Sequence, residues 1–226
     1  MIAVASGKGG SGKTTTTLGL ARGLSRRGAP AVAADADWDL PNLARLASET
    51  ADGTAGTGAR DRPTVVDAVR GGGSISPDRR SPTVLAAPED PDPVDPGPTF
   101  GSLGEAVPDD AATLLDCPAG ASPDAAAPLR AADRSLLVTP LRRAALRDAA
   151  KTAAIARRLD CPPLGAVAVC ASSVPDPVAD LLGCPVVGRI PDRAPTPLSA
   201  SAVRSAYDDL ARRLAQGYGA GRWRVA

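Results

Sequence analysis

Short apolar runs alternate along the chain with longer stretches in which apolar residues recur every three or four positions. Runs of this kind are typical of strands that are buried on both faces of a sheet. Because strands that alternate with helices indicate βαβ units, we expect one α/β domain with a mostly parallel central sheet and helices on both faces. The predicted strands cover residues 2–5, 31–34, 83–86, 113–115, 135–139, 166–170 and 185–187.

Three stretches show helical periodicity. The first covers residues 13–27, where Leu20 and Leu24 are four positions apart and Gly28 follows as a C-terminal stop. Alanine and leucine form an apolar stripe in residues 142–159, and a second stripe runs through residues 199–216. We interpret these stripes as the faces that pack on the core.

Two glycines lie inside the first predicted helix, at Gly19 and Gly23. Glycine lowers helix propensity, so a packing reason is needed to account for two of them. We expect them to let this helix approach the sheet closely.

Residues 48–62 and 87–99 are rich in glycine, proline, aspartate and threonine. Proline removes a hydrogen-bond donor and blocks helices, so both stretches are predicted to be surface loops. Residues 217–226 are rich in glycine and predict a flexible tail.

The 226 residues suit a single domain over 1–226, and the formal net charge of +1 gives no general attraction to DNA or an anionic membrane. The first residues contain no basic leader, and their apolar run is too short for a signal peptide. No stretch approaches the roughly 20 apolar residues that span a bilayer. We therefore expect a cytoplasmic protein.

The four cysteines, Cys117, Cys161, Cys170 and Cys184, are widely spaced and include no C-x-x-C pair. This spacing argues against a zinc ribbon and against a dithiol redox motif. We expect small buried thiols, with Cys117 packed beneath a loop.

A glycine-rich segment directly after the first predicted strand satisfies G-x-x-x-x-G-K-[ST], and a helix is predicted to follow it. Backbone N–H groups of such a loop surround phosphates, the lysine reaches their terminal oxygens and the hydroxyl ligates Mg²⁺. The segment and the residue after it comprise Gly7, Lys8, Gly9, Gly10, Ser11, Gly12, Lys13, Thr14 and Thr15.

Aspartates follow two of the predicted strands. Asp35 and Asp37 come after the second strand, and Asp116 closes the strand that leads into the sequence D-C-P-A-G, which ends at Gly120. Carboxylates at the carboxyl ends of parallel strands face the crevice where ligands bind in open α/β sheets. We expect Mg²⁺ and water there.

Together these motifs resemble the CobQ/CobB/MinD/ParA family of P-loop ATPases with a deviant Walker A motif, and D-x-P-A-G resembles its MinD branch in particular. Lys8 matches the family's signature lysine, and Pro191 with Asp192 matches its closing I-P-x-D loop. The resemblance implies that the protein binds ATP with Mg²⁺ and holds ADP after turnover. It also implies slow hydrolysis and an ATP-dependent homodimer.

The resemblance assigns roles residue by residue. Lys8 would reach across the dimer to the partner's nucleotide, while Lys13 and Asp37 would act in catalysis, Asp37 by orienting the attacking water. The metal would be held by Thr14, Asp35 and Asp116. Gly120, Pro191 and Asp192 would contact the nucleotide.

The chain departs from the family where many members carry an adenine-reading asparagine. Here that segment is Cys170-Ala171-Ser172-Ser173-Val174. A serine cannot match both edges of adenine as an amide can. The choice of ATP over GTP therefore rests on the resemblance alone.

Members of the family position the division site, segregate DNA, place surface structures or carry iron–sulfur clusters. Spatial positioning of cellular machinery, with an activator protein as partner, is the reading that D-x-P-A-G favours. An iron–sulfur carrier of the Mrp type and a nucleotide-binding adaptor without hydrolysis are the alternatives. DNA or membrane contact would place the protein at the nucleoid or the membrane surface, and the arginines that could form a basic surface are Arg142, Arg143, Arg147, Arg157 and Arg158.

Overall fold

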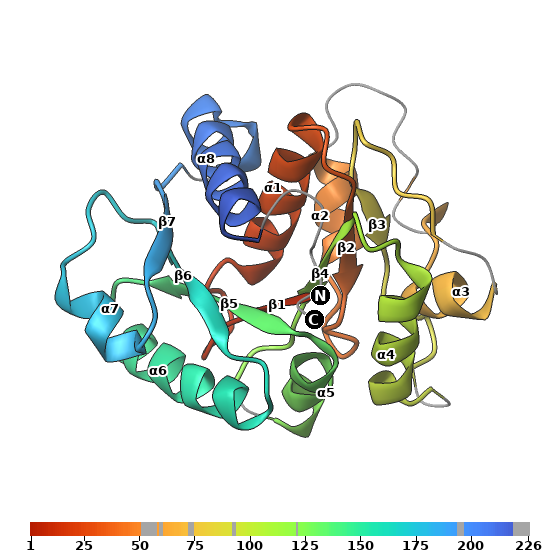
Figure 1. The fold of residues 1–226 in the computed structure, drawn as a ribbon, viewed down its shortest axis with the longest axis horizontal. Coiled ribbons are helices and arrows are strands. Elements are labelled where there is room, and N and C mark those ends of the chain that lie inside the picture. The colour runs from red at the N-terminus through yellow and green to blue at the C-terminus, as the bar shows by residue number, and fades with distance from the viewer. Residues whose placement is uncertain are drawn as a thin grey trace.

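The computed structural model describes residues 1–50, 58, 61–71, 75–91, 94–120, 122–193 and 197–218. These residues form a seven-stranded parallel sheet in the order β3-β2-β4-β1-β5-β6-β7 (Figure 1). The strands are β1 (Ile2–Ala5), β2 (Ala31–Asp35), β3 (Thr83–Leu85), β4 (Ala112–Asp116), β5 (Arg134–Pro140), β6 (Pro163–Val169) and β7 (Val186–Ile190). The helices are α1 (Lys13–Arg26), α2 (Leu43–Glu49), α3 (Val65–Arg70), α4 (Pro96–Ala106), α5 (Pro123–Ala131), α6 (Arg143–Arg158), α7 (Pro177–Leu182) and α8 (Ser201–Tyr218).

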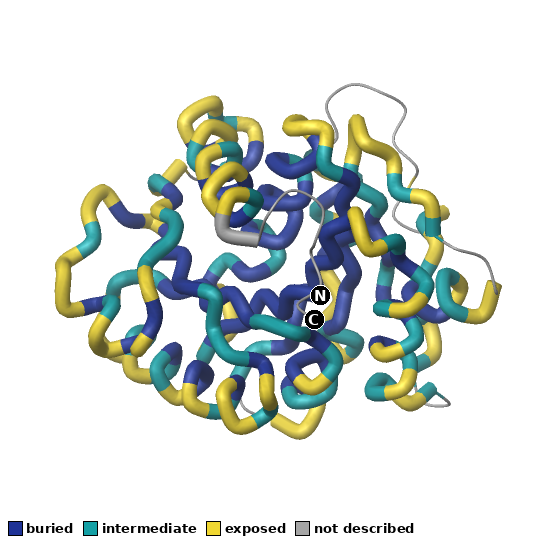
Figure 2. The backbone as a smooth tube through the Cα atoms, in the orientation of Figure 1, coloured by how far each residue is buried: buried dark blue, intermediate teal, exposed yellow. Residues whose placement is uncertain are grey.

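Helices cover both faces of the sheet, as predicted. One apolar cluster joins α1, α2 and α8 to one face, and two further clusters join α3 to α7 to the opposite face. Figure 2 shows the sheet as the buried layer between them, with the exposed residues on the outer sides of the helices. Alternate residues of β1 enter different clusters, Ile2 on one side and Ala3 on the other, which explains why the strands read as continuous apolar runs.

The predicted strands all overlap observed strands, and the three predicted helices begin and end within two residues of α1, α6 and α8. The shorter helices α2, α3, α5 and α7 were not expected from the periodicity. They are six to nine residues long, too short for a stripe to repeat.

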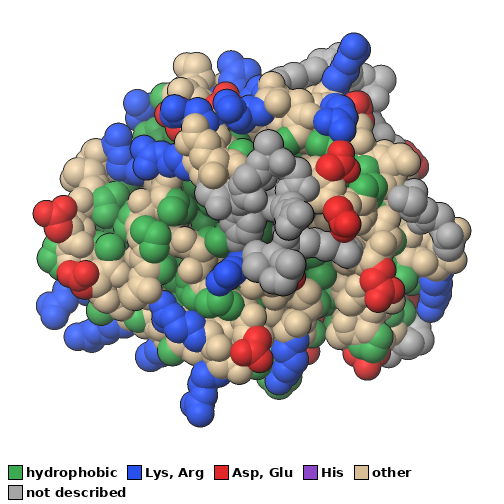
Figure 3. Space-filling view, in the orientation of Figure 1, with side chains coloured by type: hydrophobic (Ala, Val, Ile, Leu, Met, Phe, Trp, Pro, Cys, Tyr) green, Lys and Arg blue, Asp and Glu red, His purple; other side chains and the backbone are tan. Residues whose placement is uncertain are grey.

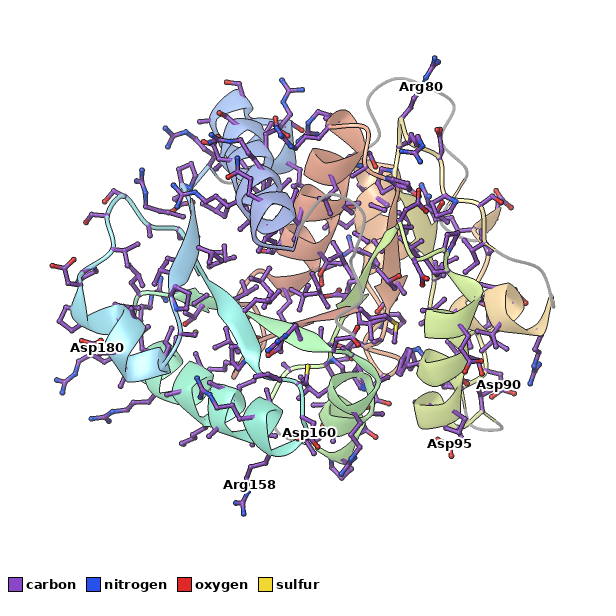
Figure 4. All side chains as sticks on the ribbon, in the orientation of Figure 1. Arg80, Asp90, Asp95, Arg158, Asp160 and Asp180 are labelled. Carbon is purple, nitrogen blue, oxygen red and sulfur yellow. The ribbon has the colours of Figure 1, made fainter. Side chains whose placement is uncertain are left out.

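The prediction that residues 87–99 form a loop is wrong at its end, because α4 begins at Pro96. Proline is compatible with the first turn of a helix, where its missing N–H would have no partner in any case. The Asp95 side chain caps this helix by accepting a hydrogen bond from the N–H of Gly97, at 3.0 Å. Figure 4 shows Asp95 at this end of α4.

Much of the other predicted loop, residues 48–62, lies outside the described residues. Its first two residues, Ser48 and Glu49, belong to α2. The predicted tail begins too early, because α8 continues through Tyr218, and residues 219–226 lie outside the described part of the chain. No helix in the described part is long and apolar enough to cross a membrane.

The two glycines of α1 face α8 and not the sheet, which corrects the prediction. A Cβ at Gly19 would lie 2.4 Å from the Tyr207 ring, and one at Gly23 would lie 2.8 Å from the Tyr207 carbonyl oxygen. The Tyr207 hydroxyl lies 3.3 Å from the Thr16 hydroxyl. Because Tyr207 is buried, the helix that begins at the phosphate-binding loop is held by a side chain from near the end of the chain.

We expect Gly19→Ala to destabilise the protein by about 1 to 3 kcal/mol, because the added methyl group has no space beside Tyr207. Gly101→Ala, on the exposed side of α4, is the matched control, since its Cβ would meet nothing within 4 Å. It should stabilise the protein by up to about 1 kcal/mol through helix propensity. Urea unfolding measures both, and equal stability of the two variants would contradict this packing.

Candidate functional site

The loop between β1 and α1 has the backbone of an anion-binding site. Gly10 and Gly12 have φ values of 69° and 86°, in the left-handed region that favours glycine. Gly12 precedes α1 and no side chain caps this helix, so its first N–H groups are open to a ligand. The Ser11 hydroxyl is buried and has no hydrogen-bond partner. Phosphate oxygens would supply the acceptors that these donors lack.

Gly7 is required where the loop passes beneath α6. A Cβ at this position would lie 2.4 Å from the carbonyl carbon of Asp148, which is part of the helix backbone. The neighbouring Ser6 hydroxyl donates a hydrogen bond to the Lys8 carbonyl oxygen, at 2.9 Å. The loop is therefore shaped by tertiary packing as well as by its own glycines.

The two lysines of the loop lie in different environments. Lys13, the first residue of α1, is buried with 7% of its surface exposed. Lys8 is exposed. Lys13 thus lies in the interior of the site, whereas Lys8 faces outward.

Asp35 and Asp116 end neighbouring strands and are partners in the parallel register of β2 and β4. The Asp35 carboxylate accepts hydrogen bonds from three backbone N–H groups, those of Asp37 at 3.1 Å and of Asn42 and Leu43 at 3.0 Å. Burial outweighs these bonds and raises the pKa of Asp35 to about 6. Through the bonds from the Asn42 and Leu43 N–H groups, Asp35 holds the start of α2 against the sheet.

Asp116 is buried as well, with 2% of its surface exposed. Burial, together with the nearby charge of Asp35, raises the pKa of Asp116 to about 7, although a hydrogen bond from the Thr14 side chain and the charge of Lys13 oppose the shift. The Thr17 hydroxyl also lies 3.4 Å from Asp116 Oδ1. The predicted metal residues Thr14, Asp35 and Asp116 are therefore brought together beside Lys13.

Asp37 lies in the segment after β2, near the same lysine. Burial raises its pKa, while a hydrogen bond from the Leu40 N–H and the charge of Lys13 lower it. Asp39 has no positive φ, so its backbone has a conformation that does not require glycine. Leu40 is 72% exposed, which is unusual for a large apolar side chain.

Gly120 adopts a φ of 89° directly after the D-C-P-A sequence. Its N–H donates to the Ser6 carbonyl oxygen at 3.2 Å, so in this conformation it is engaged within the protein. A contact between this N–H and a γ-phosphate would require that bond to open. Cys117 is buried in an apolar cluster, as expected for a packed thiol.

The other side of the loop borders a cavity of 750 Å³. Gly10, Ser11, Gly12 and Thr15 form one wall, and the predicted contacts Pro191 and Asp192 line the cavity after β7. Asp35, Asp37 and Asp116 are not part of its lining. The cavity therefore suits the base and sugar of a nucleotide whose phosphates pass through the loop to the carboxylates.

The segment that begins at Cys170, which the resemblance placed at the base, lines this cavity, whereas sequence reasoning did not expect Arg142 or Tyr207 there. Cys170 corrects the expectation of buried thiols, because it is exposed and has a φ of 52°. The other three cysteines are buried. Arg142 follows β5, and Tyr207 lies on α8. Sequence reasoning also missed Thr17, which lies near Asp116, and only the threonine run at the start of α1 could have indicated it.

The residues present fit a nucleotide with Mg²⁺. The orphaned Ser11 hydroxyl and the uncapped start of α1 need an anion, while the paired carboxylates with raised pKa values need a cation. Oxygen ligands of this kind are those that Mg²⁺ prefers, with phosphates and water completing its shell. Among the described residues no group of three or more acidic, cysteine or histidine side chains could bind a metal unaided.

Three comparisons with known proteins agree with this geometry. The chain is 29% identical over 214 residues to the septum site-determining protein MinD of Synechocystis, covering 85% of this chain and 76% of that protein. MinD of Pyrococcus horikoshii, solved in complex with Mg-ADP, superposes with a TM-score of 0.75 at 22% identity and 96% coverage of both chains. MinD from the MinC:MinD complex of Aquifex aeolicus gives a TM-score of 0.72, also at 22% identity and 96% coverage of both.

The solved structures establish that the fold is the P-loop NTPase fold of MinD. The family model of the CobQ/CobB/MinD/ParA nucleotide binding domain matches residues 2–212, which is nearly all of the described part. The chain therefore belongs to the CobQ/CobB/MinD/ParA family of P-loop ATPases.

Proposed function

We propose that this protein is an ATP-binding, slowly hydrolysing dimerisation switch of the MinD/ParA type. The observation that carries the proposal is the contrast between buried Lys13 and exposed Lys8 within one loop. A lysine that serves only its own nucleotide belongs in the interior of the site. An exposed lysine in the same loop suits a nucleotide held by a second copy of the chain.

Within one protomer, the start of α1 and the Ser11 hydroxyl bind the phosphates, and Lys13 neutralises their terminal oxygens. Thr14, Asp35 and Asp116 would hold Mg²⁺, which supplies further neutralisation of phosphate charge. Pro191 and Asp192 border the base. Together these groups position the triphosphate against the carboxylates.

Asp37 is the residue that we assign to the attacking water. Partial burial raises its pKa, which strengthens this group as an acceptor for the proton of the water, while the hydrogen bond from the Leu40 N–H and the charge of Lys13 oppose the rise. Positioning supplies most of phosphoryl-transfer catalysis. Because the Gly120 N–H is engaged with Ser6, we expect slow turnover until a partner shifts this loop.

The dimer surface that we propose contains Lys8 and the segment after Asp37. Leu40 and its neighbours Asp39, Pro41 and Asn42 are exposed there. Asp35 ties this segment to the metal residues through the Asn42 and Leu43 N–H groups. Nucleotide state would thus alter the surface that a second protomer contacts.

Positioning of cellular machinery is the role that we propose, by similarity to the MinD relatives. The Aquifex MinD was solved with MinC, which supports an activator or effector partner here. DNA or membrane contact would use α6, where Arg143, Arg147 and Arg158 are exposed. Figure 3 shows several Lys and Arg side chains in blue along the lower left edge of the molecule, where α6 lies in Figure 1. Arg158 points away from the molecule (Figure 4). Arg157 instead donates to the Leu182 and Gly183 carbonyls and supports α7.

The alternatives receive less support. An iron–sulfur carrier needs accessible cysteines, and Cys117, Cys161 and Cys184 are buried. A nucleotide-binding adaptor without hydrolysis would not need Asp37 beside Lys13, yet the two are close enough to interact electrostatically.

We expect Lys13→Ala to lose binding of Mg·ATP, and Lys8→Ala to keep binding while losing the ATP-dependent dimer. Sedimentation velocity with ATP or ADP measures the oligomeric state, and phosphate release measures turnover. Lys151→Ala is the matched control, because it removes the remaining lysine of the chain from an exposed position on α6. If ATP changes neither turnover nor oligomeric state in the wild type, the switch is refuted.

In the absence of nucleotide and Mg²⁺, the free energy of unfolding should fall as the pH rises from about 4 to about 7. The folded protein holds protons on Asp35 and Asp116 in this range, whereas the unfolded chain releases them. Above pH 7, Asp116→Asn should be more stable than the wild type by about 2 kcal/mol or more, and the difference should shrink toward pH 4.

Urea unfolding at pH 5 and pH 8 tests this expectation. Asp90→Asn, at an exposed position away from the site, is the control. A loss of stability in Asp116→Asn that is equal at both pH values would show that Asp116 carries no unfavourable charge in the folded protein.

A further inference from the structure

The outer edge of the sheet at β7 is open to a further strand. β7 is the last strand in the order, and no strand of the described part pairs with its other edge. On its inner side, the Pro185 and Ile190 carbonyl oxygens accept hydrogen bonds from the N–H groups of Ala166 and Ala171, at 2.8 and 3.2 Å. Backbone groups alternate between the two sides of a strand, so some of those between Pro185 and Ile190 face the open edge. Such an edge can accept an extended segment through backbone hydrogen bonds.

A groove of 620 Å³ follows this edge between β7 and α8. Its strand wall runs from Val186 to Pro191. Its helix wall is one face of α8 from Ala202 to Arg213, because the lining residues recur there at positions i, i+3, i+4, i+7, i+8 and i+11. The rise per residue makes each wall about 16 Å long, which is the length of an extended segment of about five residues.

The two walls run in opposite directions. α8 begins shortly after β7 and turns back along it (Figure 1). They approach closely within the groove, because a Cβ at Gly188 would lie 3.1 Å from Cδ1 of Leu210. Arg189 is the next residue toward the carboxyl end of β7, whereas Arg213 lies about one turn of α8 beyond Leu210, toward the amino end of β7. The two arginines are therefore on opposite sides of the Gly188–Leu210 contact.

Positive charge predominates along this groove. Arg189 and Arg213 are exposed, and neither forms an ion pair with the described part of the chain. The Arg189 guanidinium donates instead to the Ser172 carbonyl oxygen, a neutral acceptor. Asp209, the acidic residue of the lining, is already paired with Arg212 at 2.6 Å. Figure 3 shows Lys and Arg side chains gathered at the upper left, over the part of the molecule where α8 and β7 lie in Figure 1. The complementary partner is therefore acidic.

We propose that this groove docks an extended acidic segment of a partner protein, which adds a strand to β7. The backbone of the segment would pair with the open edge, and its apolar side chains would lie against the half-buried Val174 and Val187. Carboxylates toward its two ends would meet Arg189 and Arg213. Pro191 lines both this groove and the nucleotide cavity, so the segment would contact the loop that borders the nucleotide. This docking goes beyond the proposed switch and does not require it.

Fluorescence anisotropy with fluorescein-labelled synthetic pentapeptides tests the docking on the full chain. The probe is Glu-Val-Thr-Val-Glu, whose central residues favour strands, and Lys-Val-Thr-Val-Lys is its matched control. We expect the acidic peptide to bind at least about tenfold more tightly than the basic one. The acidic peptide with its three central amide nitrogens methylated keeps the charge but lacks those backbone donors. It should bind about tenfold more weakly than the unmethylated peptide.

Arg213→Glu reverses one charge of the groove at an exposed position. It should weaken the acidic peptide by about tenfold and strengthen the basic one. Arg158→Glu, at an exposed position on α6, is the matched control and should change neither affinity.

Equal binding of the acidic and basic peptides to the wild type, or no binding of the acidic peptide, would overturn the inference. Undiminished binding of the methylated peptide would overturn the added strand, because charge alone would then hold the segment. Displacement of the acidic peptide by an equal concentration of a short DNA duplex would assign the groove to nucleic acid and overturn it too. None of these measurements needs a nucleotide, so each failure leaves the proposed switch untouched.

Discussion

The burial of Asp35 and Asp116 side by side is the constraint on which the rest of the site depends. Parallel pairing of β2 with β4 places both carboxyls at the same edge of the sheet, and burial raises the pKa of each. Two buried negative charges so close together are unfavourable without a cation. Lys13 supplies part of the compensation, and a metal ion with its nucleotide would supply the remainder. The site is therefore poised to change when its ligand changes.

Helix α1 connects the buried carboxylates to other parts of the molecule. It begins at the phosphate-binding loop, contacts Asp116 through Thr17, and packs through two glycines against Tyr207 of α8. Tyr207 also lines the cavity. Helix α1 and the Tyr207 side chain thus connect the loop, the carboxylates and the cavity. A ligand that moves the loop would be resisted by contacts from both halves of the chain.

Much of this arrangement can be predicted from the sequence. The glycine-rich motif, the carboxylates that end two strands and the alternation of apolar runs predict the sheet, its helices and the phosphate site, because each depends on local spacing. The short helices could not be predicted from the periodicity. The Pro96 that suggests a loop instead begins α4, since proline fits a first helical turn when Asp95 caps it.

The sequence by itself determined the strand and helix periods, the phosphate-binding loop and the residues that could hold a metal. Tertiary structure alone decided that Lys8 is exposed while Lys13 is buried. It also decided that Gly19 and Gly23 leave space for α8 to pack against α1. The cavity likewise brings together Arg142, Cys170 and Asp192 only in the folded protein. These outcomes depend on contacts between residues that are far apart in the chain. No local pattern encodes such contacts, because burial and approach distance are set only when the layers pack.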